Sequence, residues 1–385
     1  MHRLQLHYSL SRQSSPAMVR NPLIDLLQAV ATQGSISGGA RALGLSYRHV
    51  WGHLKRWENE LGKELVVWEK GQAAQLSEFG AKLMWAERQA QSRLAPHIEG
   101  LRAELERSFA VAFDDSAHVV TLYASHDEAL SSLREHALRL QPGQLHLDIR
   151  FAGSVDAIRA LNEGRCVMAG FHTLQDTSAN SLSQRTYQAL LQPGRHKIIG
   201  FAARTQGLMV APGNPLGLHS LADLARTQAG FVNRALGSGT RLVLDELLAK
   251  AGVAAAKING YARTEPSHAA VAHAVAVGQA QAALGIAVAA HSAGLDFVPL
   301  AQERYNLVCL KSALVQPGTL ALLDVLRSSA WHAELGQVAG YAPQQSGQVL
   351  SMRQVLPWWN FARAKPRRLD KAPTQHPRQR QFKKA

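Results

Sequence analysis

Residues 34–66 read GSISGGARALGLSYRHVWGHLKRWENELGKELV, and they decide the fold of the N-terminal part of the chain. Ser35 or Ser37 is placed to cap a short helix, and Gly44 permits a tight turn after it. Ser46 caps a second helix, in which apolar residues recur at helical spacing on one side and basic or polar residues on the other. Two helices joined by a glycine turn, the second capped and basic, predict a helix-turn-helix.

The second helix of this motif has the properties of a helix that reads DNA. Its apolar side, with Val50, Leu54, Trp57 and Leu61, would pack against a core and leave the polar side for the major groove. A basic helix alone is as often a plain solvated surface, but the ordered series of cap, helix, turn, capped basic helix and wing favours DNA binding. Residues near the helix start suit base edges, and later ones suit phosphates. The predicted DNA-binding residues are Ser35, Ser37, Ser46, Tyr47, Arg48, His49, His53, Lys55 and Arg56.

Signals on both sides extend the motif to a winged helix-turn-helix domain, which we place at residues 21–80. Asn21-Pro22 starts its first helix, because Asn is a good cap and Pro tolerates the first helical position. The runs LVVW and QLS, on either side of Lys70-Gly71, predict the two short strands of a wing.

A long helix follows the wing, from Glu78 to about Arg107, and it is rich in good helix formers. Pro96 should kink or break this helix near its middle. We place this linker helix at residues 81–112.

Composition indicates a soluble globular protein with basic ends. The chain has 385 residues and a formal net charge of +14, and much of the excess lies in residues 351–385, a predicted basic disordered tail. Residues 1–20 are predicted to be a disordered arm, and Met18 would serve as an alternative start. No stretch has the ~20 apolar residues that cross a bilayer, and the N-terminus lacks the apolar centre of an export signal. A cytoplasmic protein without a membrane partner is therefore expected.

No catalytic or metal-binding pattern stands out in the sequence. Cys166 and Cys309 each lie in an apolar run and are too few for a disulfide framework, so they are expected to be buried free thiols. We find no nucleophile elbow, P-loop, metal-ligand cluster or paired carboxylates. The prediction is a protein that is not an enzyme and has no cofactor and no metal.

Residues 113–350 alternate short β-rich runs with helical segments. Strand runs are expected at HVVTLYA, LHLDIRF, VMAGF, KIIGFAA, GLMVAP, AGFVN, AALGI, LDFVPL and YNLVCL. This alternation predicts a parallel α/β sheet, built twice over as two lobes that close on a ligand at the carboxyl ends of the strands.

The segment AGFVNRALGSGTRLVLDELLAKAG carries the clearest sign of a ligand site. A strand, a Gly-Ser-Gly-Thr turn and a helix start would point backbone N–H groups, hydroxyls and the helix dipole at one spot, which suits an anion. Ser125 and Ser154 also follow strands and precede helices. A plain glycine-rich turn and two ordinary helix caps are the alternatives. The predicted ligand-binding residues are Ser125, Ser154, Asn233, Arg234, Gly237, Ser238, Gly239, Thr240 and Arg241.

These motifs carry a resemblance to known regulators. Residues 34–66, with Leu76-Ser77 and Gly80, resemble the N-terminal domain of ModE- and LysR-type regulators, and Ser46-Tyr47-Arg48 with Trp51 resembles ModE more. Gly38-Gly39 stands where relatives usually carry Ala-Ala, which costs roughly 1 kcal/mol per Gly in helix stability. In relatives the long helix mediates dimerisation, so the resemblance implies a homodimer or homotetramer on double-stranded DNA.

The second half is similar to the PBP-like domain fused to ModE-type helix-turn-helix domains. The matching stretches include NRALGSGTRLVLDELLAKAG and GLDFVPLAQERYNLV. The resemblance implies a bilobed, type II periplasmic-binding-protein-like fold that binds a molybdate- or tungstate-type oxyanion with hydroxyls and backbone amides. Arg234, Arg241, Glu265, His172 and His268 are weaker candidates by the same resemblance. An arginine-lined pocket would instead suit a small carboxylate such as formate, and a molybdenum-cofactor-type ligand is a further alternative.

The sequence as a whole predicts a DNA-binding transcriptional regulator that senses a small anion. A solute-binding protein of an anion transporter would explain the second half but not the first. The ligand, the target promoters and the sign of regulation stay open at this point.

Overall fold

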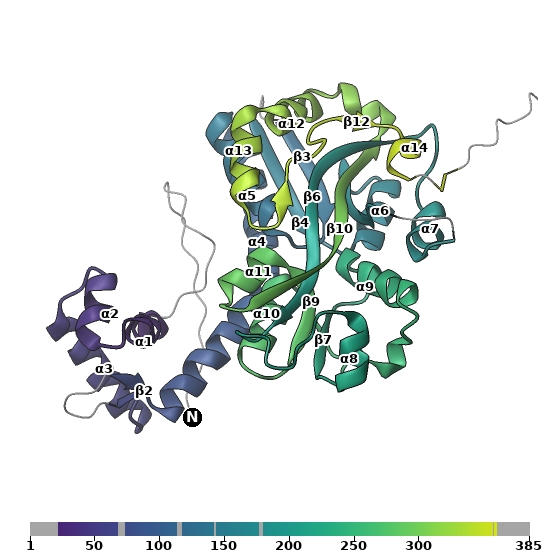
Figure 1. Cartoon of the computed structure of the whole chain (residues 1–385). Helices are drawn as coiled ribbons and strands as arrows, with labels where there is room; N and C mark the ends of the chain where they lie inside the picture. Colours follow the sequence, from purple (N-terminus) through teal and green to yellow (C-terminus); the bar gives the residue numbers. More distant parts are fainter. Residues whose placement is uncertain are drawn as a thin grey trace, which may run out of the picture.

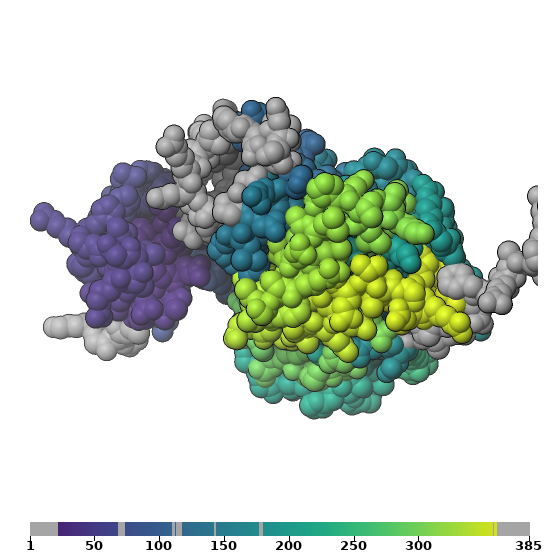
Figure 2. All heavy atoms as spheres, turned by 90° about the horizontal axis from the view of Figure 1, so that it is seen from above, coloured from purple at the N-terminus to yellow at the C-terminus, as the bar shows by residue number. Residues whose placement is uncertain are grey.

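The computed structural model describes residues 22–67, 74–113, 118–141, 144–176, 180–356 and 358–359. A small N-terminal helical domain is joined by one long helix to a larger α/β domain (Figure 1). The space-filling view shows the N-terminal domain standing apart from the rest of the molecule (Figure 2). The predicted arm at 1–20, the cap at Asn21, the turn at Lys70-Gly71 and the tail after residue 360 lie outside the described residues.

The N-terminal domain has the predicted order of helices and wing strands. Leu27, Val30, Val50, Leu54 and Leu65 form the centre of its core, and each is almost fully buried. The wing strands pair antiparallel. The elements are α1 (Pro22–Gln33), α2 (Ile36–Ala42), α3 (Tyr47–Leu61), β1 (Val66–Val67) and β2 (Gln75–Leu76).

The linker helix α4 (Glu78–Phe113) is longer than predicted and continues through Pro96. Of the predicted kink or break at Pro96, the break does not occur. Contacts on both sides of the proline hold the helix in place, because Arg93 pairs with Glu265 and Ala103 is buried. The single hydrogen bond that Pro96 cannot donate is outweighed by this packing.

The C-terminal domain is built on one mixed sheet with the order β4-β3-β5-β10-β6-β9-β7-β8. The predicted all-parallel sheet was wrong, because β10 runs antiparallel to β5 and β6, and β9 runs antiparallel to β6. β11 and β12 add to β6. The strands are β3 (His118–Ala124), β4 (Leu145–Phe151), β5 (Met168–Leu174), β6 (His196–Val210), β7 (Phe231–Arg234), β8 (Thr264–Glu265), β9 (Ala282–Ile286), β10 (Asp296–Leu310), β11 (Tyr341–Ala342) and β12 (Val349–Leu350).

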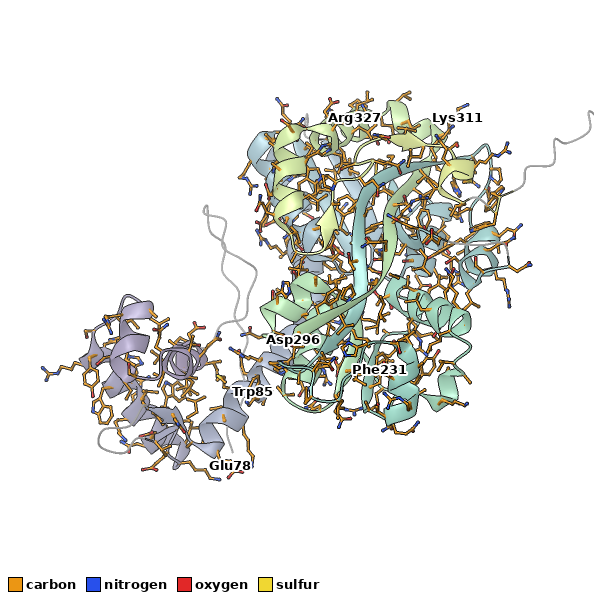
Figure 3. The ribbon with its side chains drawn as sticks, in the orientation of Figure 1. Glu78, Trp85, Phe231, Asp296, Lys311 and Arg327 are labelled. Atoms are coloured by element: carbon orange, nitrogen blue, oxygen red, sulfur yellow. The ribbon has the colours of Figure 1, made fainter. Side chains whose placement is uncertain are left out.

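Two long strands connect the two lobes of this domain. KIIGFAA and GLMVAP, predicted as separate strands, are both parts of β6, and LDFVPL and YNLVCL are both parts of β10. Polar residues interrupt the apolar runs in the sequence, but the strands continue through them because β6 and β10 pair along their length. In Figure 1 β6 and β10 run from the lobe with β3 and β4 to the lobe with β7 and β9. In Figure 3 Lys311 and Arg327 mark the first lobe, and Phe231 and Asp296 mark the second.

Helices cover both lobes. The first lobe carries α5, α6, α12 and α13, and the second carries α8, α9 and α10 (Figure 1). Trp358 and Trp359 are buried in a core cluster with Tyr187, so the packed chain extends beyond residue 350, where the sequence placed the start of a tail. No helix in the described ranges is long and apolar enough to cross a membrane. The helices are α5 (Glu128–Leu140), α6 (Ser154–Asn162), α7 (Leu182–Gln188), α8 (Leu221–Thr227), α9 (Gly239–Lys250), α10 (His268–Ala276), α11 (Ala287–Ser292), α12 (Pro317–Arg327), α13 (Ser329–Gln337) and α14 (Met352–Val355), with 3-10 turns at Ala255–Lys257 and Lys311–Val315.

Candidate DNA-binding surface and ligand site

Helix α3 has the local structure that its sequence predicts. The Ser46 hydroxyl accepts a hydrogen bond from the His49 backbone N–H at 3.2 Å, and Gly62 ends the helix with a φ of 69°. Val50 and Leu54 are buried, whereas Trp57 and Leu61, which were predicted to face inward with them, are half-buried against the same core.

The outer side of α3 carries the predicted DNA-binding residues. Ser46, Tyr47, Arg48, His49 and Arg56 are exposed, and His53 and Lys55 are partly exposed. These side chains are ordered along the helix by contacts with one another. The Tyr47 and Trp51 rings stack with 6.3 Å between centroids, the His49 and His53 rings stack at 4.3 Å, and the Lys55 ammonium lies 4.9 Å from the Trp51 ring.

The two serines at the start of α2 have different positions. Ser35 is the cap, and its hydroxyl accepts from the Gly38 N–H at 3.0 Å, whereas Ser37 lies exposed within the helix. A Cβ atom at Gly39 would lie 3.0 Å from the backbone nitrogen of Val30 on α1. Glycine at this position therefore allows a close contact between α1 and α2, which offsets its low helix propensity.

Glu58 is a structural residue of this domain that the sequence reasoning missed. Its Oε1 atom accepts from the backbone N–H groups of Leu65 at 2.9 Å and Val66 at 3.3 Å, and its Oε2 atom lies 2.6 Å from Lys55 Nζ. Burial raises the pKa of the Glu58 carboxyl, but the bonds from Lys55, Leu65 and Val66 outweigh it and leave the pKa lowered. The charged side chain thus connects α3 to the first wing strand.

In the C-terminal domain the two predicted serines of the first lobe are buried. Ser125 follows β3, and its hydroxyl has no hydrogen-bond partner among the described residues. The cap of the next helix is Asp127, which accepts from the Ala129 N–H. Ser154 is the first residue of α6 and lies beside the phenol of Tyr187. Neither serine caps a helix, so the simpler reading of both as caps does not hold.

The Gly-Ser-Gly-Thr turn of the second lobe lies against the first lobe. A Cβ atom at Gly153 would overlap the carbonyl of Gly237, and one at Gly239 would overlap the imidazole of His172 on β5. Ser238 caps α9 by accepting from the Arg241 N–H at 3.3 Å, which leaves its hydroxyl proton free to be donated. The α9 N-terminus therefore points at the junction of the lobes.

The side chains of three polar residues next to this turn differ in their partners. Arg234 is 2% exposed, and its Nε and Nη1 atoms have no partner among the described residues. Asn233 is engaged with backbone, because its Oδ1 accepts from the Arg234 N–H and its Nδ2 donates to the Tyr261 carbonyl. Arg241 turns aside, with Nε 3.3 Å from Asp245 Oδ1 and its guanidinium 4.0 Å from the Tyr261 ring centroid.

A buried ion network beneath the turn was not predicted. Arg204 on β6 bonds to the carboxylates of Asp127 and Glu303, and the Tyr341 hydroxyl donates to Asp127 Oδ2 at 2.6 Å. Gln206 Nε2 donates to Glu303 Oε1 at 3.0 Å. Charged residues inside the apolar runs of β6 and β10 were the sequence signal that could have indicated this network.

The surroundings of the site lower the pKa of Arg234 and of the histidines His172 and His268. Burial, and after it the charge of Arg204, lower the pKa of the Arg234 guanidinium to about 9. Burial and the arginines also hold the pKa of His172 and His268 well below the ordinary value. His268 Nε2 lies 3.3 Å from Thr240 Oγ1. Neutral imidazoles can both donate and accept hydrogen bonds here.

The structure thus brings Gly153 and Ser154 to the Gly-Ser-Gly-Thr turn and adds His172 beside Gly239 and His268 beside Thr240. Ser125 and Arg234 are buried and have polar atoms without a partner among the described residues. The structure does not bring in Arg241 or the Asn233 side chain. Glu265, a weaker candidate, pairs with Arg93 on α4 instead. Cys166 and Cys309 are buried free thiols, as predicted, and burial raises the pKa of Cys166 to about 11 and that of Cys309 to about 12.

Comparison with known proteins identifies both halves. A helix-turn-helix family, described as "Bacterial regulatory helix-turn-helix protein, lysR family", matches residues 23–81, and the "PBP superfamily domain" matches residues 135–327, which is half of the chain. These matches define a DNA-binding transcriptional regulator with a ligand-binding domain. The chain belongs to the PBP superfamily domain family, and its residues 23–81 form a helix-turn-helix of the kind found in the lysR family.

Two sequence relatives cover parts of the chain. "Uncharacterized protein YvgK" of Bacillus subtilis (strain 168) is 31% identical over 223 residues, which are 58% of this chain and 70% of the relative. A Clostridium pasteurianum protein, "Uncharacterized protein in ferredoxin 2Fe-2S gene 5'region", is 34% identical over 111 residues, which are 29% of this chain and 98% of the relative.

Solved structures with a similar arrangement are LysR regulators. CbnR, a LysR family transcriptional regulator, has a TM-score of 0.39 and 16% identity, and the match covers 79% of this chain and 99% of CbnR. ArgP from Mycobacterium tuberculosis has a TM-score of 0.38 and 18% identity, and the match covers 83% of this chain and 99% of ArgP. The predicted α/β fold with an N-terminal helix-turn-helix is confirmed, whereas the closer resemblance to ModE stays a prediction.

Proposed function

We propose that this regulator reads DNA with the outer side of α3 and that a small anion, bound where the two lobes meet, modulates this binding. The observation that carries the proposal is Arg234, a buried guanidinium with two N–H groups that have no partner among the described residues. An unpaired charge in the interior is costly, and an anionic ligand would offset that cost. The α9 N-terminus and the Ser125 and Ser238 hydroxyls add donors of the kind that oxyanions need.

Two classes of small anion fit these donors. A molybdate- or tungstate-type oxyanion would be bound by hydroxyls and backbone amides, as the sequence resemblance implies. A small carboxylate such as formate would use the planar fork of an arginine, which matches a carboxylate with two parallel bonds. The open Nε and Nη1 atoms of Arg234 lie on different edges of the guanidinium, so they offer two separate contacts, and both classes of anion stay open.

Helix α4 is placed to transmit the state of the lobes to the DNA-binding domain, because it contacts both of them. On the second lobe, Ser267 Oγ donates to the Ser92 carbonyl at 3.1 Å, and the Trp85 and His273 rings lie 5.5 Å apart. Figure 3 labels Trp85 on α4. On the first lobe, Ser131 Oγ donates to Glu99 Oε2 at 2.9 Å. A ligand that changes the angle between the lobes would therefore act on α4 directly.

We also propose that the protein is a homodimer, or a homotetramer built from such dimers. Leu94, Leu101 and Leu105 form an exposed apolar stripe at helical spacing along α4. Pairing of two α4 helices would cover this stripe and place two α3 helices to reach successive major grooves, roughly 34 Å apart. Such a regulator would act in the cytoplasm, where bacterial DNA lies.

An electrophoretic shift and footprint of the full-length protein on its own upstream DNA tests the proposal. We expect specific binding that changes with formate, acetate, molybdate or tungstate. Arg48→Ala should weaken specific binding by roughly 1–3 kcal/mol, as expected for a residue that reads a base edge. Unchanged affinity and base preference in this variant would contradict the assignment of α3, and an affinity that no anion alters would contradict the sensing role.

A further inference from the structure

Two acceptor atoms in the ligand site have no donor. Glu303 Oε2 and Gln206 Oε1 are buried and have no hydrogen-bond partner among the described residues. The orientation of the Gln206 amide is fixed, because its Nε2 atom donates to Glu303 Oε1 at 3.0 Å. The two open oxygens therefore belong to side chains that touch each other.

These acceptors lie beside the proposed anion-binding donors. Gln206 Nε2 is 3.4 Å from Thr240 Oγ1 in the first turn of α9. Glu303 Oε1 is 3.6 Å from Nδ1 of His172, the residue that lies against Gly239 at the α9 N-terminus. The site therefore has donors at Arg234 and α9 and acceptors at Glu303 and Gln206, within one buried region.

A bare anion would leave half of this region unsatisfied. Formate and molybdate bring acceptors alone, so the Glu303 and Gln206 oxygens would stay without a donor, and a buried acceptor without a donor is unfavourable. One group that satisfies both acceptors needs at least two protons, which a hydroxyl lacks and an ammonium has.

The sum of the charges in the site favours a ligand that has no net charge. Arg204 and Arg234 carry two positive charges, and Asp127 and Glu303 carry two negative charges, so the cluster is neutral before a ligand binds. A ligand with no net charge keeps it neutral and can still pair its anionic end with Arg234, whereas a bare anion pairs with Arg234 but leaves the cluster with one excess negative charge.

We propose that the ligand is a small zwitterion, whose carboxylate binds Arg234 and the α9 N-terminus and whose ammonium binds Glu303 and Gln206. This inference rests on the ligand site of the proposed function and narrows the ligand from an anion to a molecule with an anionic and a cationic end. A site that hydrogen-bonds a substrate N–H discriminates strongly against the analogue that lacks it.

Calorimetric titration of the full-length protein with matched pairs tests this inference. The matched pairs are glycine with acetate and alanine with propionate. β-Alanine, glycolate, formate and molybdate are titrated as further single ligands. We expect at least one amino acid to bind about 100-fold more tightly than its carboxylate partner. If acetate, propionate, formate or molybdate binds within tenfold of the best amino acid, the zwitterion is excluded while the anion site stands. If none of these compounds binds, the anion site is wrong as well.

Glu303→Gln provides a second measurement. Glutamine keeps an oxygen for Arg204 but replaces the open acceptor with an NH₂ group, so the preference for the amino acid over its carboxylate partner should fall to less than tenfold. A preference that persists in a folded variant would contradict the role of Glu303. Circular dichroism and a melting curve check the fold of the variant, and if it does not fold, the matched pairs on the unaltered protein decide.

Discussion

Arg93 on α4 makes two hydrogen bonds to the carboxylate of Glu265, from Nε to Oε2 at 2.9 Å and from Nη2 to Oε1 at 2.6 Å. Glu265 pairs in register with Arg234 across β8 and β7. One ion pair therefore links the linker helix to the strand next to the ligand site.

Loss of this pair should loosen α4 from the second lobe. Arg93 is half exposed, so solvent screens the pair, and we expect Arg93→Met to speed amide hydrogen exchange around residues 89–97 only about fivefold, the equivalent of roughly 1 kcal/mol. Lys82→Met, which removes a fully exposed pair with Glu78 on the same helix, is the control and should leave that exchange unchanged. Equal exchange in both variants would argue against a coupling role for Arg93.

Arg234→Met should stabilise the protein without ligand and abolish ligand binding. Methionine fills a similar volume without a buried charge, and we expect a stabilisation of roughly 1–4 kcal/mol, the range found when buried ion pairs are replaced by apolar residues. The matched variant Arg241→Met removes an arginine that is engaged with Asp245 and Tyr261, so it should melt at or below the normal temperature and still bind ligand. A lower melting temperature for Arg234→Met would contradict the unpaired state of this guanidinium.

The stabilisation by Arg234→Met should depend on pH. Because the pKa of Arg234 is lowered to about 9 in the folded protein, the unfolded chain binds more protons than the folded one above this pH. The unaltered protein thus gains stability from this group as the pH rises past about 9, and the melting-temperature gap to the variant should be smaller at pH 10 than at pH 7.5. A constant gap would show that Arg234 does not lose its proton there.

The helices and the shorter strands could be predicted because their signals are local. The cap at Ser46, the glycine at 62 and the apolar periodicity between them define α3 without reference to the rest of the chain. The long strands β6 and β10 could not be predicted in the same way. Arg204, Gln206 and Glu303 interrupt their apolar runs, and the pairing that keeps these strands continuous joins residues about a hundred positions apart.

In the candidate site too, residues marked by a short sequence pattern could be predicted, whereas contacts between segments far apart in the chain could not. Ser125, Ser154 and Ser238 were predicted from strand-to-helix junctions, which are visible in the sequence. Arg234 and Arg241 flank the same turn and were not told apart: Asp245, one turn further along α9, is visible in the sequence as a partner for Arg241, whereas the contact with Tyr261 comes from a separate segment. The ion network was missed because its members come from segments far apart in the chain.

Glu58→Ala should destabilise the N-terminal domain, because it leaves the buried Leu65 N–H and the half-buried Val66 N–H without this acceptor. We expect a loss of about 1–3 kcal/mol. Glu60→Ala, which removes an exposed pair with Arg56 on the same helix, should change stability little. Because the pKa of Glu58 is lowered in the folded protein, the stability that its carboxylate contributes depends on pH. This stability is present above the ordinary glutamate pKa and is lost as the pH falls through the pKa of the folded state. Melting curves at pH 7 and pH 4 measure both effects, and equal melting of the two variants would contradict this role.

Leu101→Glu should convert the proposed dimer to monomers. Leu101 is 58% exposed at the centre of the apolar stripe on α4, and a charge there would be buried without a partner in a helix pair. Leu320→Glu, at a similarly exposed leucine on α12, is the matched control and should keep the dimer. Sedimentation velocity distinguishes the species, and a dimer that survives Leu101→Glu would place the interface elsewhere.

Gly52 lies in the middle of α3, is exposed, and has no atom within 4 Å of the position that a Cβ would occupy. Glycine costs about 1 kcal/mol relative to alanine inside a helix, and nothing in the described residues requires it here. If α3 lies in the major groove, the missing side chain lets the helix backbone approach the DNA closely.

Gly52→Ala should therefore raise the stability of the domain by up to about 1 kcal/mol and weaken specific DNA binding by about tenfold, a loss similar to the roughly 1–3 kcal/mol of one mismatched base pair. Gly336→Ala, at an exposed glycine of α13 with equal space around it, should give the first effect without the second. Binding isotherms and melting curves of the two variants separate these effects, and normal DNA affinity in Gly52→Ala would mean that this side of α3 does not face the duplex.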